Sequence, residues 1–443
     1  MRVGNPTHRR RLLQALIGYG DVLQTLHSCL CALSMASCVD TVAADADAPP
    51  LPPPRWPSHY KRITRVPFGD GEQSTLDLLA GYIEREEPVI LEGSDVVDPV
   101  HWEDDAKVAA LLGSRTVLVK RSSSSRFRYW AIPTAPRLSP LLNEGPQAGE
   151  GGPAVFGFEP PTREEYLTFG EFQREAARLA ASESAERMYL QETMSGHTEM
   201  VDEFRSWNWR FLLQNSQRHG WGVPDANELF IGMRGAETPC HFDERHNLFF
   251  QVRGTKQLLL FPFVDYERLY PFPVTHPCDR QSMVNVVSPD HERFPAFSAA
   301  TGCYATLRPR DLVFIPFGWW HWLRNDDALA VSISFWSMSP PTDLSKGVPD
   351  TFSAHELTRV KRNLEKHMAS RFGAEFPRRM RMLLRLVDAG AADVECADTT
   401  VEEVLAEARA LLVAVKVADR AAQDDFLRSM LRVRFEPGWQ AHV

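Results

Sequence analysis

The sequence predicts a mainly β core of the barrel or sandwich type, with flanking helices and a helical C-terminal region. Between Leu229 and Ser337, short strand-like runs alternate with Gly, Pro and Asp: "ELFIGM", "HFDERHNLFFQV", "GTKQLLLFP", "RDLVFIP" and "ALAVSISFW". No helical pattern of 10 to 15 residues separates these runs, which argues against a parallel doubly wound sheet. After Pro341, apolar residues recur at helical spacing, first at 357–368 and then at 401–412, the latter preceded by a Thr400–Glu403 capping box.

Composition limits the function classes. The chain has 443 residues, 44% of them hydrophobic and 24% charged, as expected of a globular protein with a substantial core. The net charge of −9 argues against a nucleic-acid binder, because phosphate contacts need clustered Lys and Arg. The seven cysteines form no CxxC pair and are odd in number, which favours reduced thiols over a disulfide framework.

The N-terminal segment, residues 1–57, is predicted to be an extension that ends in a Pro-rich tether, "ADADAPPLPPPRWP", which is expected to be extended and not part of a core. Its first part, "RRRLLQALIGYGDVLQTLHSCLCALSMASCV", is basic and then apolar, so it is either a targeting leader or a dispensable extension. Asp21 and His27 interrupt the apolar run, so no membrane span is expected. We expect a cytoplasmic or nuclear protein, with organelle targeting by the leader left open.

Residues 58–345 are predicted to form the main domain. "STLDLLAGYIEREEPVIL" is typical of an amphipathic helix with Ser74 as its N-cap, followed by a short strand. A Gly/Pro-rich insertion is expected near 132–165, then a helix and a strand at Met188–Gln191. Residues 346–443 form the predicted helical region.

A metal site is suggested by the stretch "PCHFDERHNLFFQVRGTK". Successive side chains of a strand alternate between faces, so His241 and Asp243 point the same way. His321, in "IPFGWWHWLRN", follows a strand and a tight turn and suits a third ligand. Two imidazoles and one carboxylate are the ligand set of non-haem Fe(II) oxygenases. An isolated HxD pair is more often surface decoration, so this interpretation needs a second feature.

Lys256 supplies that feature. It shares its strand face with Leu258 and Leu260, and an inward lysine is costly unless it meets an anion. A dicarboxylic cosubstrate that chelates the metal at one end would bring an anion at the other. Neighbouring polar residues are weaker candidates: His246, His276 and His291 are expected to be structural or surface histidines, and Cys240 a small core residue.

These stretches resemble the JmjC dioxygenases. "TPCHFDERHNLFFQVRGTKQLLLFP", "LYPFPVTHPCDRQS", "ERFPAF", "DLVFIPFGWWHW" and "ISFW" are most similar to the branch of factor inhibiting hypoxia-inducible factor, an asparaginyl hydroxylase. The resemblance runs from about Arg62 to about Gly390. It implies a double-stranded β-helix of the jelly-roll, or cupin, type, with Fe(II) on His241, Asp243 and His321, and with 2-oxoglutarate and O2 as cosubstrates.

The resemblance also implies binding roles for further residues. Lys256, Thr238 and Tyr189 would hold the distal carboxylate of 2-oxoglutarate, with Asn247 in the same pocket. The target peptide would be oriented by Gln191, Arg280, Gln281 and Tyr129, with Trp336 as a wall. The chain departs from the family pattern at Ser334, where an Asn is expected, so contacts to the cosubstrate are expected to differ there.

The predicted function is therefore hydroxylation of asparagine side chains, with ankyrin-repeat proteins as the substrate class that the resemblance suggests. Three alternatives stay open: another JmjC activity such as lysyl demethylation, a non-catalytic cupin-like binding module, and a zinc hydrolase on the same ligands. The helix from Leu357 to Met368 and the run "RRMRMLLRLV" carry apolar stripes, and the resembled family pairs C-terminal helices, so a homodimer is expected.

Overall fold

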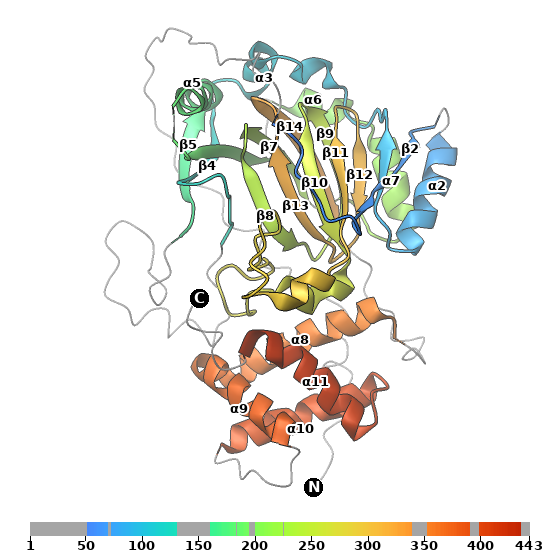
Figure 1. The fold of residues 1–443 in the computed structure, drawn as a ribbon. Coiled ribbons are helices and arrows are strands. Elements are labelled where there is room, and N and C mark those ends of the chain that lie inside the picture. Colours follow the sequence, from blue (N-terminus) through green and yellow to red (C-terminus); the bar gives the residue numbers. More distant parts are fainter. Residues whose placement is uncertain are drawn as a thin grey trace.

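Eight strands build the centre of the computed structural model, which describes residues 51–69, 72–130, 160–182, 184–194, 200–224, 226–338, 352–389 and 398–435. The strands are divided equally between two sheets that face each other, and the chain passes from one sheet to the other at six of the seven connections between them (Figure 1). One sheet has the order β1 (Lys61–Arg62), β11 (Cys303–Leu307), β10 (Lys256–Phe261), β13 (Trp320–Asn325) and β8 (Glu237–Phe242). The other has the order β2 (Thr64–Pro67), β3 (Val89–Glu92), β12 (Leu312–Ile315), β9 (His246–Arg253), β14 (Leu329–Ser337), β7 (Ala226–Met233), β6 (Arg187–Thr193), β4 (Thr116–Ser122) and β5 (Arg163–Thr168).

The strands β7 to β14 form a double-stranded β-helix, so the predicted fold class is confirmed. All of their mutual pairings are antiparallel. The larger sheet continues past β7 through the antiparallel strands β6, β4 and β5. An apolar cluster fills part of the barrel interior: Ile63, Ile90, Phe249, Leu258, Leu260, Leu307, Val313, Ile315 and Leu323.

Helices cover the outer face of the larger sheet. They are α2 (Glu72–Glu84), α3 (Asp105–Leu112), α5 (Phe169–Ala180), α6 (Val201–Ser206) and α7 (Trp209–Arg218), with the 3-10 turn η1 (Pro99–Trp102). Helix α2 begins at Glu72, so Ser74 lies inside the helix and the predicted N-cap is wrong. In α5, Thr168 is the N-cap of a capping box with Glu171.

The C-terminal part is helical, as predicted. It contains α8 (Ala354–Phe372), η5 (Gly373–Glu375), α9 (Phe376–Ala389), α10 (Thr399–Ala414) and α11 (Arg420–Phe435). Asp398 caps α10 by accepting from the Thr400 N–H, so the predicted Thr400–Glu403 capping box is wrong. This unit lies below the barrel, beneath η2 (Phe263–Leu269) and η3 (Pro295–Ala299) (Figure 1).

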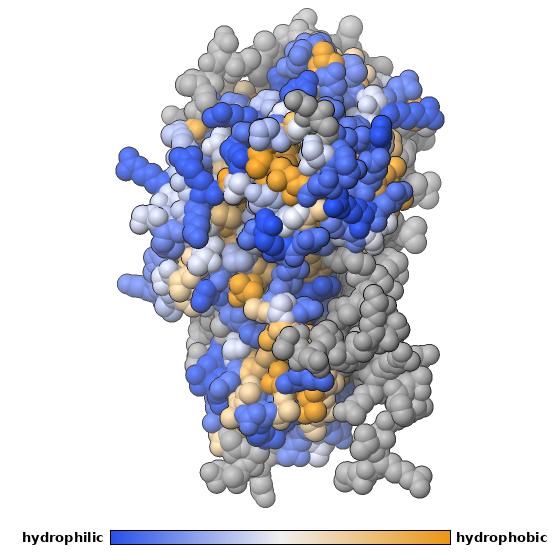
Figure 2. Space-filling view, turned by 90° about the vertical axis from the view of Figure 1, so that its right-hand side faces the viewer, coloured by the Kyte–Doolittle hydropathy of each residue, from blue (hydrophilic) through white to orange (hydrophobic). Residues whose placement is uncertain are grey.

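The apolar stripe of α8 is covered within the same chain. Leu364 is fully buried in a cluster with side chains of α9, α10 and α11. The side of the molecule that carries α2 and α7 is mostly hydrophilic, with small separate apolar areas on the barrel and on the helical unit (Figure 2). The homodimer stays a prediction, but the stripe used to argue for it is not available to a second subunit.

The end of the Pro-rich tether packs on the barrel, contrary to the expectation that it lies outside any core. The Leu51 N–H donates to the Asp326 carbonyl at 3.0 Å, and Arg324 donates to the Pro52 carbonyl at 2.7 Å. The Trp56 ring meets Trp322 edge-on, with centroids 5.6 Å apart. Residues 1–50 and most of the predicted insertion lie outside the described residues, and β5 begins within the last part of that insertion.

No helix in the described ranges is both long enough and apolar enough to cross a membrane.

Candidate active site

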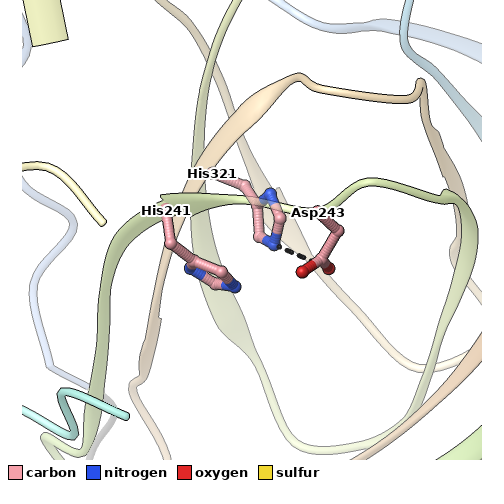
Figure 3. A group of neighbouring side chains, drawn as sticks. All are labelled: His241, Asp243 and His321. Atoms are coloured by element: carbon pink, nitrogen blue, oxygen red, sulfur yellow. Dashed lines mark ion pairs between the residues drawn. The ribbon is translucent and has the colours of Figure 1, made fainter. Parts of the chain in front are cut away.

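The three predicted ligands meet at one end of the barrel. His241 lies on β8 and pairs in register with His321 on the adjacent β13, and Asp243 follows β8 directly. One nitrogen or oxygen from each of the three residues lies within 4.8 Å of the others (Figure 3). Among the described residues, no other group of three His, Cys, Asp or Glu side chains is arranged in this way.

Hydrogen bonds set the imidazoles for metal binding. His241 Nδ1 lies 2.9 Å from the Pro239 carbonyl, and His321 Nδ1 lies 3.0 Å from the Trp319 carbonyl. A carbonyl only accepts, so each Nδ1 carries the proton and each Nε2 keeps its lone pair. Burial, together with His321, lowers the pKa of His241 to about 3, so that ring is neutral at physiological pH.

Asp243 completes a site that fits a divalent metal. Its Oδ2 lies 3.6 Å from His321 Nε2 and is buried without a hydrogen-bond donor. Burial alone would raise the pKa of Asp243, but the facing imidazoles and Arg280 outweigh it and hold that pKa below its usual range. A buried carboxylate oxygen without a donor, facing two imidazole lone pairs, is the donor set of a 2-His-1-carboxylate centre.

A buried lysine lies deeper in the barrel. Lys256, the first residue of β10, is 1% exposed, and its Nζ lies 3.3 Å from the Tyr189 hydroxyl. The aromatic rings of Tyr189 and Phe249 lie 5.6 and 5.2 Å from Nζ. Burial lowers the pKa of Lys256 to about 7, and within the described ranges no carboxylate lies within ion-pairing distance. A charged Lys256 amine would have no counter-ion among the described side chains, so one bound anion would balance its charge.

Residues predicted for the same pocket surround Lys256. The Tyr189 hydroxyl hydrogen-bonds Thr238, while burial raises the pKa of Tyr189. Gly232 lies opposite Tyr189 in the β6–β7 pairing, and a Cβ there would approach Asn325 Nδ2 to 1.9 Å and the Tyr189 ring to 2.6 Å. Gly232 is therefore required because no side chain fits beneath the Tyr189 ring.

Ser334 partly replaces the amide that the resemblance leads one to expect. Asn247 Nδ2 donates to Ser334 Oγ at 3.2 Å, across the β9–β14 pair. The Asn247 Oδ1 is buried without a partner, since one hydroxyl cannot both accept from and donate to the amide in this geometry. A polar group of a ligand or a water would satisfy it.

Three of the predicted target-binding residues, Arg280, Gln281 and Tyr129, lie beside the triad. Arg280 Nη1 is 3.6 Å from Asp243 Oδ1, and the Arg280 guanidinium stacks over the Tyr129 ring at 5.6 Å. The Tyr129 ring contacts His241 edge-on at 5.2 Å. Gln281 pairs with His241 through an isolated bridge, and its Nε2 donates to the Tyr129 carbonyl.

Three polar atoms of this region are buried without a partner: Tyr129 Oη, Gln281 Oε1 and Trp336 Nε1. Trp336 meets Phe230 edge-on at 6.2 Å. Buried polar atoms are normally hydrogen-bonded, and a bound ligand or water would supply the partners of these three.

Sequence reasoning missed Glu228. It lies on β7 opposite Ser334 and Thr193, and Thr193 Oγ1 donates to it at 2.5 Å. Burial raises the pKa of Glu228, against hydrogen bonds from Thr193 and Gln191. Gln191 is therefore held by a carboxylate. The signal was present, because Glu228 has the same strand parity as the inward Phe230.

His246 and Cys240 are structural, as expected. The His246 ring stacks on Trp221 at 4.3 Å and accepts from the Phe317 N–H at 3.1 Å. Cys240 is buried on the opposite face of β8 from His241, among aromatic side chains.

Fold and site together define the class: a jelly-roll barrel with a 2-His-1-carboxylate centre. Residues 75–343 match the model of the cupin-like domain family, and the chain belongs to that family. It is 41% identical over 133 residues to "HSPB1-associated protein 1" of Homo sapiens, covering 28% of this chain and 27% of that protein. It is 38% identical over 109 residues to "Lysine-specific demethylase 8" of Xenopus tropicalis, covering 24% of each chain. "Lysine-specific demethylase JMJ30" of Arabidopsis thaliana is 28% identical over 176 residues, 39% of each chain. The matched region is about a quarter of the length of the first of these relatives.

Proposed function

We propose that this protein is an Fe(II)- and 2-oxoglutarate-dependent oxygenase that hydroxylates asparagine side chains of proteins, ankyrin-repeat proteins among them. One observation carries the proposal. A fully buried lysine without a carboxylate partner in the described residues lies in the same barrel as the His241, Asp243 and His321 triad. A metal-chelating keto acid with a second carboxylate fits both features.

In the proposed cosubstrate pocket, one group of residues would bind the distal carboxylate and the triad would bind the metal. Lys256 would form an ion pair with the distal carboxylate, and the hydroxyls of Tyr189 and Thr238 would donate to it. The triad would hold the metal, which supplies the redox chemistry that couples O2 to the keto acid. The role of the protein is to place one substrate C–H bond beside that centre and to exclude competing reactions.

The region above the triad favours a neutral amide as the target. A side-chain amide has two N–H donors and one acceptor oxygen. Gln281 Oε1 would accept from the amide nitrogen, while Trp336 Nε1 and the Tyr129 hydroxyl would donate to the amide oxygen. Gln191, held by Glu228, lies on the neighbouring strand β6. One side-chain amide would thus give a hydrogen-bond partner to all three atoms, which supports an amide as the target group.

A lysyl demethylase is the second candidate, favoured by the names of two relatives. Methyl-lysine is a cation, and such sites are aromatic cages. Here the Arg280 guanidinium already occupies the Tyr129 face beside Asp243. A second cation at that place would be repelled, which supports the amide.

The test is incubation of an ankyrin consensus peptide with protein, Fe(II), 2-oxoglutarate and air, followed by tandem mass spectrometry. We expect one added oxygen, on asparagine. Oxygen on lysine, or loss of methyl from a methyl-lysine peptide, would defeat the asparaginyl assignment and keep the oxygenase. Absence of succinate under every condition would favour a binding module or a zinc hydrolase.

A further inference from the structure

Arg362 of the C-terminal helix α8 connects the helical unit to the candidate metal site. Its side chain is only 4% exposed. Nε donates to Glu244 Oε1 at 2.6 Å, and the two terminal nitrogens donate to both oxygens of Asp279 at 2.9 and 2.7 Å. Its guanidinium also lies 5.1 Å from the Phe242 ring. A bidentate pair plus a further charge-assisted bond fixes the positions of both carboxylates.

Each of these carboxylates belongs to a residue adjacent to a site residue. Glu244 follows Asp243, and Asp279 precedes Arg280. Arg280 Nη1 in turn lies 3.6 Å from Asp243 Oδ1. Arg362 therefore holds, from the side of α8, the two backbone segments whose side chains converge on the carboxylate ligand.

The segment before Gln281 needs such support. Arg280 has a φ of 67°, a left-handed conformation that is unfavourable for a side chain with a Cβ. Asp279 Oδ1 accepts from the Arg280 N–H at 2.7 Å, in addition to its bond from Arg362. The Arg280 carbonyl accepts from the Phe242 N–H at 3.0 Å, which ties the segment to the end of β8.

The carboxylates have few other partners that could replace Arg362. Lys366, one helical turn further along α8, donates to both Glu244 oxygens at 3.0 and 3.2 Å. Among the described residues, Asp279 has no second cationic partner within ion-pairing distance. Loss of the Arg362 fork would thus release Asp279, and with it the left-handed turn at Arg280.

We propose that Arg362 is a positioning residue of the metal site: through Glu244 and Asp279 it fixes the orientation of Asp243 and Arg280. This inference rests on the metal site of the proposed function, and not on its substrate. The C-terminal helical unit is then a part of the site and more than a covering of the barrel.

The experiment measures Co(II) binding to the full chain, without cosubstrate, from the visible absorption of the bound ion at a temperature well below Tm. Arg362→Lys keeps the charge but cannot form the bidentate fork, and Asp279→Asn keeps the shape while weakening the pair. Lys361→Ala is the matched control. It also removes an ion pair of α8, but the partner is Glu267 of η2, which is not adjacent in sequence to Asp243 or Arg280.

We expect both test variants to bind Co(II) about tenfold more weakly, since partners behind metal ligands are typically worth this much. The control is expected to stay within about twofold of the parent. Equal Co(II) affinity of parent and both test variants, even with a lowered Tm, would reduce Arg362 to a structural residue and overturn the inference. If the parent itself does not bind Co(II), the metal site and the proposed function fail together.

Discussion

Replacing Lys256 with methionine should change stability and cosubstrate binding in opposite directions. The amine is fully buried and meets three aromatic rings and one hydroxyl. Burial lowers the pKa of Lys256 from 10.5 to about 7, which corresponds to a cost on the order of 5 kcal/mol, as an upper bound, when the amine is charged. Methionine is apolar and has a similar length, so ligand-free Lys256→Met should have a Tm several degrees above that of the parent.

Binding should weaken, because the distal carboxylate of 2-oxoglutarate would lose its ion partner in a desolvated pocket. Truncating one partner of such a pair costs about 2–5 kcal/mol. At about 1.4 kcal/mol per decade, the Kd of 2-oxoglutarate should rise at least about thirtyfold. Metal affinity should stay unchanged, since Lys256 is not a ligand.

The assay is isothermal titration calorimetry with 2-oxoglutarate and Mn(II) under nitrogen, with thermal unfolding monitored separately. Lys120→Met is the matched control. Lys120 lies on β4, opposite Tyr189 of the neighbouring strand β6, and it already has an ion-pair partner, Glu164, at 4.0 Å. The control should change the Kd less than threefold. An unchanged Kd for Lys256→Met would remove Lys256 from the pocket, and a lower Tm would refute the unpaired-amine argument.

Other predictions test the remaining parts of the site. Asp243→Ala should abolish iron-supported release of succinate, and parent-like turnover would disprove the triad. Gln191→Leu should depress peptide hydroxylation at least tenfold more than peptide-free decarboxylation, measured as succinate in both cases. Because Lys256 has a pKa of about 7 and binds an anion as an ammonium, 2-oxoglutarate binding should weaken by up to about tenfold per pH unit above 7, with uptake of a proton seen by calorimetry in two buffers. The lowered pKa of Lys256 should also narrow the Tm difference between Lys256→Met and the parent as the pH rises from 7 toward 10.5. In this range the amine is neutral in the folded parent and protonated in the unfolded chain, so rising pH removes the proton that favours unfolding. The homodimer now rests on the resemblance alone, because the α8 stripe is covered in the same chain; light scattering at micromolar concentration tests it, and a monomer would disprove it.

The candidate metal triad could be predicted from the sequence because strand parity is local. His241 and Asp243 share a face two residues apart, and the inward position of Lys256 follows from the same alternation. The β core and the helical C-terminal region were predictable for a similar reason, since apolar periodicity reports which face of each element is buried. Helix starts were less predictable: Ser74 and Thr400 are plausible caps by residue type, but Glu72 begins one helix and Asp398 caps the other. Competing cap residues differ by only about 1 kcal/mol, so tertiary packing decides between them.

Only the tertiary structure decided which distant groups meet. Glu228 became a partner of Gln191 through the β6–β7 register, and Ser334 left Asn247 Oδ1 unpartnered through the β9–β14 register. The α8 stripe looked available to a second subunit, but α9, α10 and α11 cover it in the same chain. Arg362 had the appearance of an ordinary helix charge, because nothing local distinguishes an exposed arginine from one that packs against two carboxylates more than 80 residues away. Such contacts depend on how whole elements pack, and sequence periodicity within one element carries no information about them.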